Sequence, residues 1–244
     1  MKLNCDLGES FGAWKMGLDD QVMPHIDMAN IACGFHAGDP SVMANTLKLA
    51  KQHNVMIGAH PSYPDKQGFG RRSMNLSVAE LTQCLHYQIA ALDGMAKAQG
   101  LTLSYVKPHG ALYNDMMKHQ PLLSAVMGAV ASYPADLKLM ILATADTKHH
   151  HTMARHLGLT LVLEAFADRL YTDQGHLVAR NIAGSVHDKA ALLAQVKQLL
   201  TSKSVTTQSG KSLKLNADSI CVHGDNAQGV ALIEDIKALC SASV

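Results

Sequence analysis

Hydrophobic and polar positions follow a repeating order along this chain: a short apolar run, a polar motif, then a stretch with helical spacing. Seven apolar runs predict β-strands at about residues 2–6, 26–32, 55–59, 103–106, 138–143, 160–164 and 219–222. Residues 139–143 are continuously apolar, which is typical of a parallel strand covered on both faces. The pattern therefore predicts an α/β protein with a parallel sheet.

Helix start signals support this division. Asp39 followed by Pro40 is typical of an N-cap and a first helical residue, where the missing N–H of proline costs nothing. Ser77 and Glu80 fit a capping box, and the residues from 81 to 92 place an apolar stripe at helical spacing. These segments are predicted to be helices that pack against the sheet.

The rest of the chain favours a barrel. Residues 186–200 and 227–240 are amphipathic, and residues 205–215 alternate around Ser209-Gly210, which predicts an exposed β-hairpin. No linker, repeat or low-complexity tract divides the chain. Seven βα units favour one domain over residues 1–244, a closed or nearly closed parallel (β/α) barrel, although an open doubly wound sheet has the same pattern.

Composition excludes several classes of protein. With 21 basic and 20 acidic residues the formal charge is +1, which gives no electrostatic reason to expect nucleic acid binding. No stretch approaches the roughly 20 apolar residues of a membrane span, and the start turns polar too early for a signal peptide. Five cysteines without CxxC spacing argue for a reducing compartment, so we expect a cytoplasmic protein.

A polar motif follows each predicted strand. These motifs are residues 4–9, 30–39, 58–61, 107–110, 144–146, 164–169 and 223–226. Because the carboxyl ends of parallel strands lie at one face, where ligands bind, we expect the motifs to form a single site.

Carboxylates and histidines dominate these motifs. Asp6 and Glu9 can bind a metal or act as a general base, or they can be an N-cap and a solvated acid. His36, His60 and His109 each follow a strand, and together with Asp6 they favour a site over isolated structural histidines. A divalent metal held by His36 and His60, with Asp6, fits the ligand chemistry, although no HExxH spacing supports it.

Side chains that could bind a polar or anionic substrate occur in two further segments, the one that begins at Lys107 and the connection of residues 61–76. Lys107 follows a buried strand, where its ammonium can stabilise an oxyanion or bind a carboxylate, unless it is a surface residue. Tyr113 and Asn114 follow it and can orient a small polar substrate. The long connection of residues 61–76 is typical of a lid, and Arg71 and Arg72 within it suit a carboxylate or phosphate. A solvated basic loop is the alternative.

Other residues are expected to be structural. Cys5 and Cys33 are predicted to pack as small hydrophobic residues, since Cys5 points opposite to its polar neighbours in the strand. Residues 149–151, three consecutive histidines, are predicted to be a solvated helix start or loop, because adjacent side chains cannot share one helical face. The chain has no P-loop and no GxGxxG motif for a nucleotide.

Together these motifs resemble the LamB/YcsF family, whose characterised bacterial members are the A subunits of 5-oxoprolinase. The resemblance covers nearly the whole chain, in residues 4–12, 30–39, 58–61, 106–113, 164–169 and 222–225. It implies an irregular seven-stranded (β/α) barrel like that of glycoside hydrolases and polysaccharide deacetylases. It also implies ATP-dependent cleavage of 5-oxo-L-proline to L-glutamate, together with partner subunits B and C.

The resemblance suggests a division of labour. A lactam is a poor electrophile, and phosphorylation of its oxygen would weaken the amide resonance. Since the chain lacks a P-loop, we expect the partners to use ATP with Mg²⁺ and this chain to bind and open the ring. The expected catalytic residues are Asp6, Glu9, Lys107 and His109. The expected substrate-binding residues are Asn30, Arg71, Arg72 and Tyr113.

Two other functions remain open at this point. One is a metal-dependent deacetylase or amide hydrolase that acts alone, which the Asp and His ligand types and the related fold would suit. The other is a non-catalytic subunit that binds oxoproline and delivers it to the partners.

Overall fold

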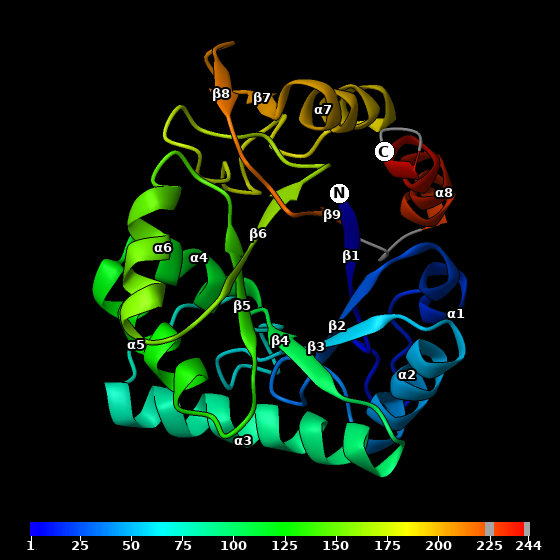
Figure 1. Ribbon diagram of the computed structural model, residues 1–244. Coiled ribbons are helices and arrows are strands. Elements are labelled where there is room, and N and C mark those ends of the chain that lie inside the picture. Colours follow the sequence, from blue (N-terminus) through cyan, green and yellow to red (C-terminus); the bar gives the residue numbers. More distant parts are fainter. Residues whose placement is uncertain (223–226, 242–244) are drawn as a thin grey trace.

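The computed structural model describes residues 1–222 and 227–241 (Figure 1). Its parallel strands close into one barrel, because the last of them pairs back onto the first. In barrel order the strands are β1 (Lys2–Leu7), β2 (Met28–Ala32), β3 (Met56–His60), β4 (Leu103–Val106), β5 (Lys138–Leu142), β6 (Leu161–Phe166) and β9 (Ser219–Val222). Each overlaps a predicted strand, so the predicted seven-stranded barrel is confirmed and the open sheet is excluded.

Helices surround this barrel on its outer side (Figure 1). They are α1 (Asp19–Val22), the short 3₁₀ helix η1 (Met23–His25), α2 (Pro40–Gln52), α3 (Val78–Ala98), α4 (Gly110–Lys118), α5 (Gln120–Ala131), α6 (Thr147–His156), α7 (Lys189–Ser202) and α8 (Ala227–Ser241). Within the described residues, no helix is both long enough and apolar enough to cross a membrane.

Three local predictions are confirmed. The Asp39 carboxylate caps α2 by accepting from the backbone N–H groups of Ser41 and Val42. The capping box of Ser77 and Glu80 is complete at the start of α3. The predicted hairpin forms outside the barrel from β7 (Ser204–Thr206) and β8 (Ser212–Lys214), which pair antiparallel.

One local prediction is partly wrong. The three consecutive histidines lie in α6, where His149 is exposed but His150 is buried. Successive helical residues point about 100° apart, so one of three neighbours turns towards the barrel while the others face away from it.

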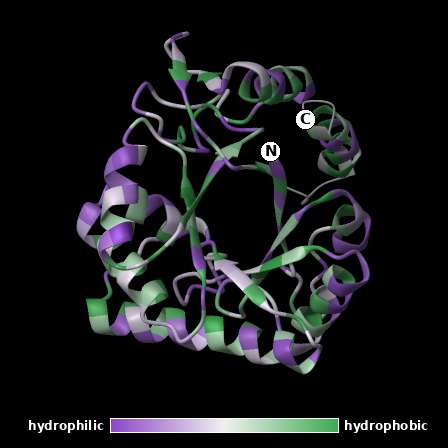
Figure 2. Ribbon diagram, in the orientation of Figure 1, coloured by the Kyte–Doolittle hydropathy of each residue, from purple (hydrophilic) through white to green (hydrophobic). Residues whose placement is uncertain are grey.

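Strand alternation divides the interior into two regions. Leu3, Cys5 and Leu7 of β1 point outwards into the main core between the barrel and the helices. Cys33 is buried in the same core, which confirms that both cysteines pack as small hydrophobic residues. Figure 2 shows hydrophobic and hydrophilic stripes along the surrounding helices, as expected for helices that cover a core on one side.

The inside of the barrel is layered. A small apolar layer there is built around Met28, Tyr105 and Met140. Gly58 of β3 leaves room for the Tyr105 ring, since a Cβ at Gly58 would lie 2.2 Å from a ring carbon. The Tyr105 hydroxyl donates to Asn30 Oδ1 at 2.7 Å, so the apolar layer adjoins a polar one. That polar layer carries the site.

Candidate active site

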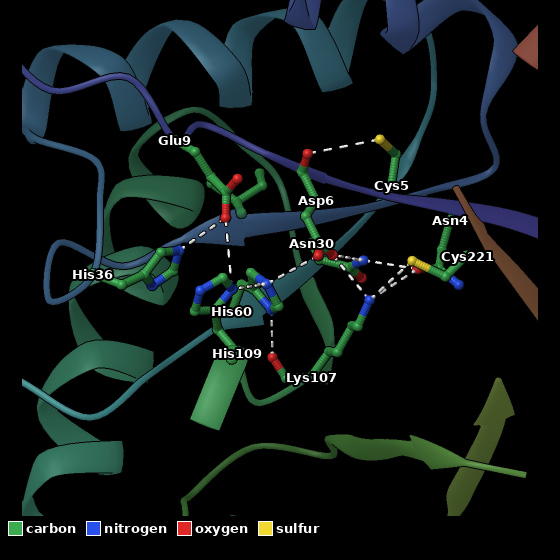
Figure 3. A network of polar contacts seen from close by, with 12 residues as sticks. Asn4, Cys5, Asp6, Glu9, Asn30, His36, His60, Lys107, His109 and Cys221 are labelled. Carbon is green, nitrogen blue, oxygen red and sulfur yellow. Dashed lines mark hydrogen bonds and ion pairs between the residues drawn. The ribbon is translucent and has the colours of Figure 1, made fainter. Parts of the chain in front are cut away.

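The carboxyl ends of the strands surround a cavity of about 740 Å³. Eight of the predicted residues line it: Asp6, Glu9, His60, Lys107 and His109 from strand-end motifs, Arg71 from the connection of residues 61–76, and Tyr113 and Asn114 from the segment after Lys107. Figure 3 shows the central polar network. Four of the seven predicted motifs therefore line one cavity, those of residues 4–9, 58–61, 107–110 and 164–169, and His36 of a fifth motif contacts Glu9. Thr144 and Asp146 of a sixth motif line a second, smaller pocket instead.

Lys107 lies at the centre of a buried polar network. Its side chain is almost fully buried, and its Nζ lies 2.9 Å from Asp6 Oδ1 and 3.1 Å from Glu164 Oε2 (Figure 3 shows the lysine). Asn4 Oδ1 at 3.4 Å and Cys221 Sγ at 3.3 Å complete its surroundings. Lys107 is therefore not a surface lysine, and its position is fixed from several strands at once.

Opposing effects act on the charge of Lys107. Burial by itself would lower its pKa, but the charge of Asp6, together with Cys221 and Glu164, outweighs burial. The pKa of Lys107 is therefore held well above its ordinary value. The residue is an ammonium at neutral pH, as oxyanion stabilisation requires.

Asn30, which we predicted to bind substrate, is fully buried and does not line the cavity. Its side-chain amide donates to Asp6 Oδ1 at 2.7 Å and to Asn4 Oδ1 at 2.8 Å. Because its own oxygen accepts from Tyr105, the orientation of this amide is determined. In this structure Asn30 orients the Asp6 carboxylate.

A histidine cluster lies beside the Asp6–Lys107 pair. His60 Nδ1 donates to the Lys107 carbonyl at 2.6 Å, and His109 Nε2 donates to the Phe69 carbonyl at 2.9 Å. In the neutral rings this leaves His60 Nε2 and His109 Nδ1 as acceptors, yet these two nitrogens lie 3.0 Å apart. Two lone pairs at this distance repel each other, so the arrangement favours a proton or a cation close to both nitrogens.

Glu9 and His36 complete the cluster. Glu9 Oε1 lies 3.0 Å from His36 Nε2 and 3.6 Å from His109 Nδ1. The His36 ring stacks on the His109 ring at a centroid distance of 3.7 Å. Burial, and then the neighbouring histidines, lower the pKa of His36 and of His109 well below the ordinary value, so both rings are neutral at neutral pH.

This cluster fits the requirements of a metal site. One ligand atom from each of Glu9, His36, His60 and His109 lies within 4.8 Å of the others. Histidines that bind metals commonly donate their second N–H to a carbonyl, as His60 and His109 do here. The cluster contains Glu9 and His109 besides the predicted His36 and His60. The predicted third ligand, Asp6, lies beside it: its Oδ2 is 3.4 Å from His60 Nε2, and its Oδ1 pairs with Lys107.

The two arginines of the predicted lid have different positions. Arg71 lines the cavity, and its guanidinium lies 5.0 Å from the centre of the Phe69 ring. Arg72 does not line the cavity; its side chain is 64% exposed and forms an ion pair with Asp65. The geometry therefore supports a ligand contact for Arg71 and a structural role for Arg72.

The lid is fixed directly over the histidine cluster. Gly70 has a φ of +64°, and its carbonyl accepts from Ala111 N at 2.8 Å, at the start of α4. A Cβ at Gly110 would lie 2.5 Å from the same carbonyl oxygen, so this approach requires glycine. The hydrogen bond between Gly70 and Ala111 holds the neighbouring Phe69 carbonyl where it accepts from His109 Nε2.

Comparison with known proteins agrees with this geometry. The sequence profile of the LamB/YcsF family matches residues 1–243. This chain belongs to the LamB/YcsF family. A relative from Chromohalobacter salexigens, named as the A subunit of 5-oxoprolinase, is 53% identical over 236 residues, which are 96% of this chain and 94% of the relative. A relative of the same name from Vibrio parahaemolyticus is 52% identical over 97% of this chain and 94% of its own length.

A solved structure is also similar to this LamB/YcsF member. The crystal structure of the lactam utilization protein from Thermus thermophilus matches it with a TM-score of 0.89 and 38% identity, covering 100% of this chain and 97% of the other. The family and fold that the motifs implied are therefore confirmed.

Four residues of this LamB/YcsF site were assigned no role from the sequence: Asn4, Glu164 and Arg169, which lie within predicted motifs, and Cys221, which lies outside the strand-end motifs. Asn4 lies two residues before Asp6 in a strand, so its side chain is on the same face as Asp6, and this spacing could have predicted its place in the site. Cys221 offered no such signal, since it reads as part of an apolar strand. The motif of residues 223–226 lies outside the described residues.

Proposed function

We propose that this chain is the A subunit of a 5-oxoprolinase, which converts 5-oxo-L-proline to L-glutamate with hydrolysis of ATP to ADP and phosphate. The observation that carries this proposal is the pairing of Lys107 with Asp6 beside the histidine cluster, in a cavity suited to a small polar ligand. The names of the relatives support the same activity. Subunits B and C are the proposed partners.

The residues of this chain suit the ring-opening half of the reaction. Asp6 or Glu9 accepts a proton from the attacking water, whose oxygen bonds to the lactam carbonyl carbon. The Lys107 ammonium stabilises the oxyanion that develops there. The carbon–nitrogen bond then breaks, and the ring nitrogen takes up a proton to become the amine of glutamate. The carbon that was attacked is left as an acyl phosphate, and a second water hydrolyses it, which releases phosphate and leaves the side-chain carboxylate. His109 lines the cavity and its Nδ1 lies 3.6 Å from Glu9 Oε1, so His109 takes part in this proton transfer only when that nitrogen holds no metal.

ATP and Mg²⁺ belong, in this proposal, to the partner subunits. The absence of a P-loop from the sequence supports this division. Phosphorylation of the lactam oxygen by the partners makes the carbonyl carbon a better target for water. We also propose a cytoplasmic location, which the five free cysteines support.

We further propose that Glu9, His36, His60 and His109 hold a divalent cation. The facing acceptor nitrogens of His60 and His109 support this assignment. A bound cation would act as a Lewis acid towards the substrate oxygen. Metal analysis of the purified chain checks this assignment, and His60→Ala is expected to lose the bound metal.

The reconstituted complex tests the function. We expect oxoproline-dependent ATP hydrolysis and glutamate formation only when all three subunits are present. Asp6→Asn and Lys107→Ala should each reduce glutamate formation at least about 100-fold. Lys148→Ala, which changes an exposed lysine of α6, serves as the control and should leave the rate unchanged. Full activity in the Asp6 and Lys107 variants would contradict the proposal.

A metal-dependent amide hydrolase that acts alone is the second candidate, and the Glu9–histidine cluster is the observation in its favour. A stoichiometric metal together with ATP-independent hydrolysis by the isolated chain would support it. A non-catalytic binding subunit is a third candidate. Tight oxoproline binding together with tolerance of Asp6 and Lys107 substitution would favour that role.

A further inference from the structure

One wall of the cavity carries a buried arginine. Arg169 follows β6, is only 6% exposed and lines the cavity. Its Nη2 donates to the Val178 carbonyl at 2.5 Å, whereas its Nε is buried and has no hydrogen-bond partner within the described part of the chain. Among the residues that the structure describes, no Asp or Glu forms an ion pair with it. Buried charges in proteins are normally paired, so this guanidinium is positioned for a partner from outside those residues.

The electrostatic setting of Arg169 agrees with this view. Burial is the main effect that lowers its pKa, the nearby Arg180 lowers it further, and Asp168 only partly opposes them. A guanidinium nevertheless keeps its charge in proteins. The free protein therefore contains a desolvated cation close to a second cation, and a bound anion would relieve both the desolvation and the repulsion.

Basic residues outnumber acidic ones along the cavity lining, where Asp6, Glu9 and Asp19 are the acidic residues. Arg71, Lys118 and Arg180 line the cavity together with Arg169. Lys107 does not add to this excess, because Asp6 and Glu164 neutralise it. The basic side chains of this lining suit an anionic ligand.

We propose that Arg169 binds the carboxylate of the lactam substrate, an assignment that rests on the proposed 5-oxoprolinase function. In 5-oxoproline the carboxylate-bearing carbon and the reacting carbonyl carbon flank the ring nitrogen on opposite sides. A ring whose carbonyl faces Lys107 can thus direct its carboxylate to another wall. Arg169 thus takes the carboxylate-binding role that the sequence suggested for Arg71 and Arg72, while Arg71, which also lines the cavity, stays available for a second contact with the ligand.

The residues between Lys107 and Arg169 suit the body of such a ligand. Phe166, three residues before Arg169, lines the cavity, and the Lys107 Nζ lies 5.4 Å from the centre of its ring. Tyr113 packs edge-on against Phe166. These aromatic rings offer an apolar surface to the methylene groups of a five-membered ring.

A ligand pair isolates the role of Arg169. 5-Oxo-L-proline and 2-pyrrolidinone share the lactam ring, but only the first carries a carboxylate. Calorimetric titration of the full chain should show tighter binding of oxoproline. Arg169→Gln should weaken oxoproline binding about 10- to 100-fold and leave 2-pyrrolidinone binding unchanged. Arg169→Lys should have an intermediate affinity, because it keeps the charge but loses the planar fork.

Controls separate recognition from a structural role. Arg155→Gln removes an exposed arginine of α6 whose side chain bonds to Thr152 of the same helix, and it should bind both ligands as the wild type does. Oxoproline should raise the thermal unfolding temperature of the wild type but not of Arg169→Gln. Equal loss of both ligands, or unchanged oxoproline affinity in Arg169→Gln, would overturn the assignment.

Failure of this proposal can be distinguished from failure of the proposed function. One outcome is that the chain binds oxoproline more tightly than 2-pyrrolidinone, in a way that depends on Arg169, while the complex shows no ATP-dependent turnover. This result would refute the proposed function but support the carboxylate site at Arg169. Another outcome is that Arg169→Gln lowers turnover but leaves the oxoproline affinity unchanged. This result would indicate that the guanidinium binds the phosphoryl group, and it would overturn the carboxylate assignment. Absence of oxoproline binding by the wild type would overturn it as well.

Discussion

Lys107 shows how a single residue combines stability with chemistry. Its ammonium is buried beside two carboxylates, which come from β1 and β6, the two neighbours of β9 in the barrel. Desolvation of these charges is costly, and their mutual attraction offsets the cost only while all partners are present. The same desolvation strengthens the interaction of the ammonium with a developing oxyanion.

Removal of the lysine should therefore destabilise the chain as well as inactivate it. We predict that Lys107→Met lowers the free energy of unfolding by about 3–5 kcal/mol, because it leaves buried carboxylates without their cation. Urea denaturation measures this change. Adding Glu164→Gln to Lys107→Met should recover part of the loss. If Lys107→Met alone were as stable as the wild type, the carboxylates would have to be protonated in the variant without loss of folding free energy, and the prediction would be wrong.

Gly58 gives a second prediction for a single residue. Gly58→Ala would place a Cβ 2.2 Å from a Tyr105 ring carbon, and the ring cannot move away without breaking its bond to Asn30. We expect a loss of about 1–3 kcal/mol in stability, as for other overpacked cores, together with lower activity. Gly94→Ala in α3 is the matched control, because nothing lies within 4 Å of its added Cβ. That control should gain up to about 1 kcal/mol from helix propensity. If the urea midpoints of Gly58→Ala and Gly94→Ala shifted by the same amount, the packing argument would be wrong.

At the scale of elements, the connections after the strands hold the functional groups in place. The connection after β3 passes over His109 and is tied internally by Asp65, which accepts from Gly68 N, Arg72 N and the Arg72 side chain. The connection after β6 carries both Arg169 and the Val178 carbonyl that holds it. Each connection positions a group of the site with polar contacts of its own.

The tie at Asp65 predicts a pH dependence. The Arg72 hydrogen bond is the main cause that lowers the pKa of Asp65 to about 2, from an ordinary value of 3.8. A carboxyl group whose folded pKa is depressed contributes stability above its unfolded pKa and loses it as the pH falls through the folded value. Stability from this group should therefore decline between about pH 4 and pH 2. Urea midpoints measured across this range should fall more steeply in the wild type than in Arg72→Gln, and equal slopes would refute the role of the pair.

At the scale of the whole molecule, two segments that contribute to the cavity lining each carry a large exposed hydrophobic side chain, Trp14 and Ile182, and we call these two side chains the rim. Ile182 lines the cavity yet is 54% exposed, and Trp14, 66% exposed, precedes the cavity residues Met16 and Gly17. Large exposed hydrophobic side chains next to a site commonly mark a surface for a partner. In the proposed complex, the partner that delivers an activated lactam would cover the rim.

The rim gives a prediction about assembly. Trp14→Ser and Ile182→Ser should leave the thermal stability of the isolated chain nearly unchanged, because both side chains are largely exposed. They should weaken binding to the partner subunits by at least about tenfold, as measured by calorimetric titration. Tyr87→Ser, 65% exposed on α3, is the control that should bind normally. Unchanged partner binding in the rim variants would exclude this surface.

The sequence by itself determined the order of strands and helices, the caps of α2 and α3, and the convergence of Asp6, His60, Lys107 and His109. These features follow from local rules: apolar periodicity, capping chemistry, and the common direction of parallel strands. Only the tertiary structure decided the partner of each group. In the structure Lys107 pairs with Glu164 as well as with Asp6. Arg72 lies outside the cavity, whereas Arg169 lines it. Barrel closure and the paths of the long connections determine such contacts between residues far apart in the chain, and no local pattern specifies them.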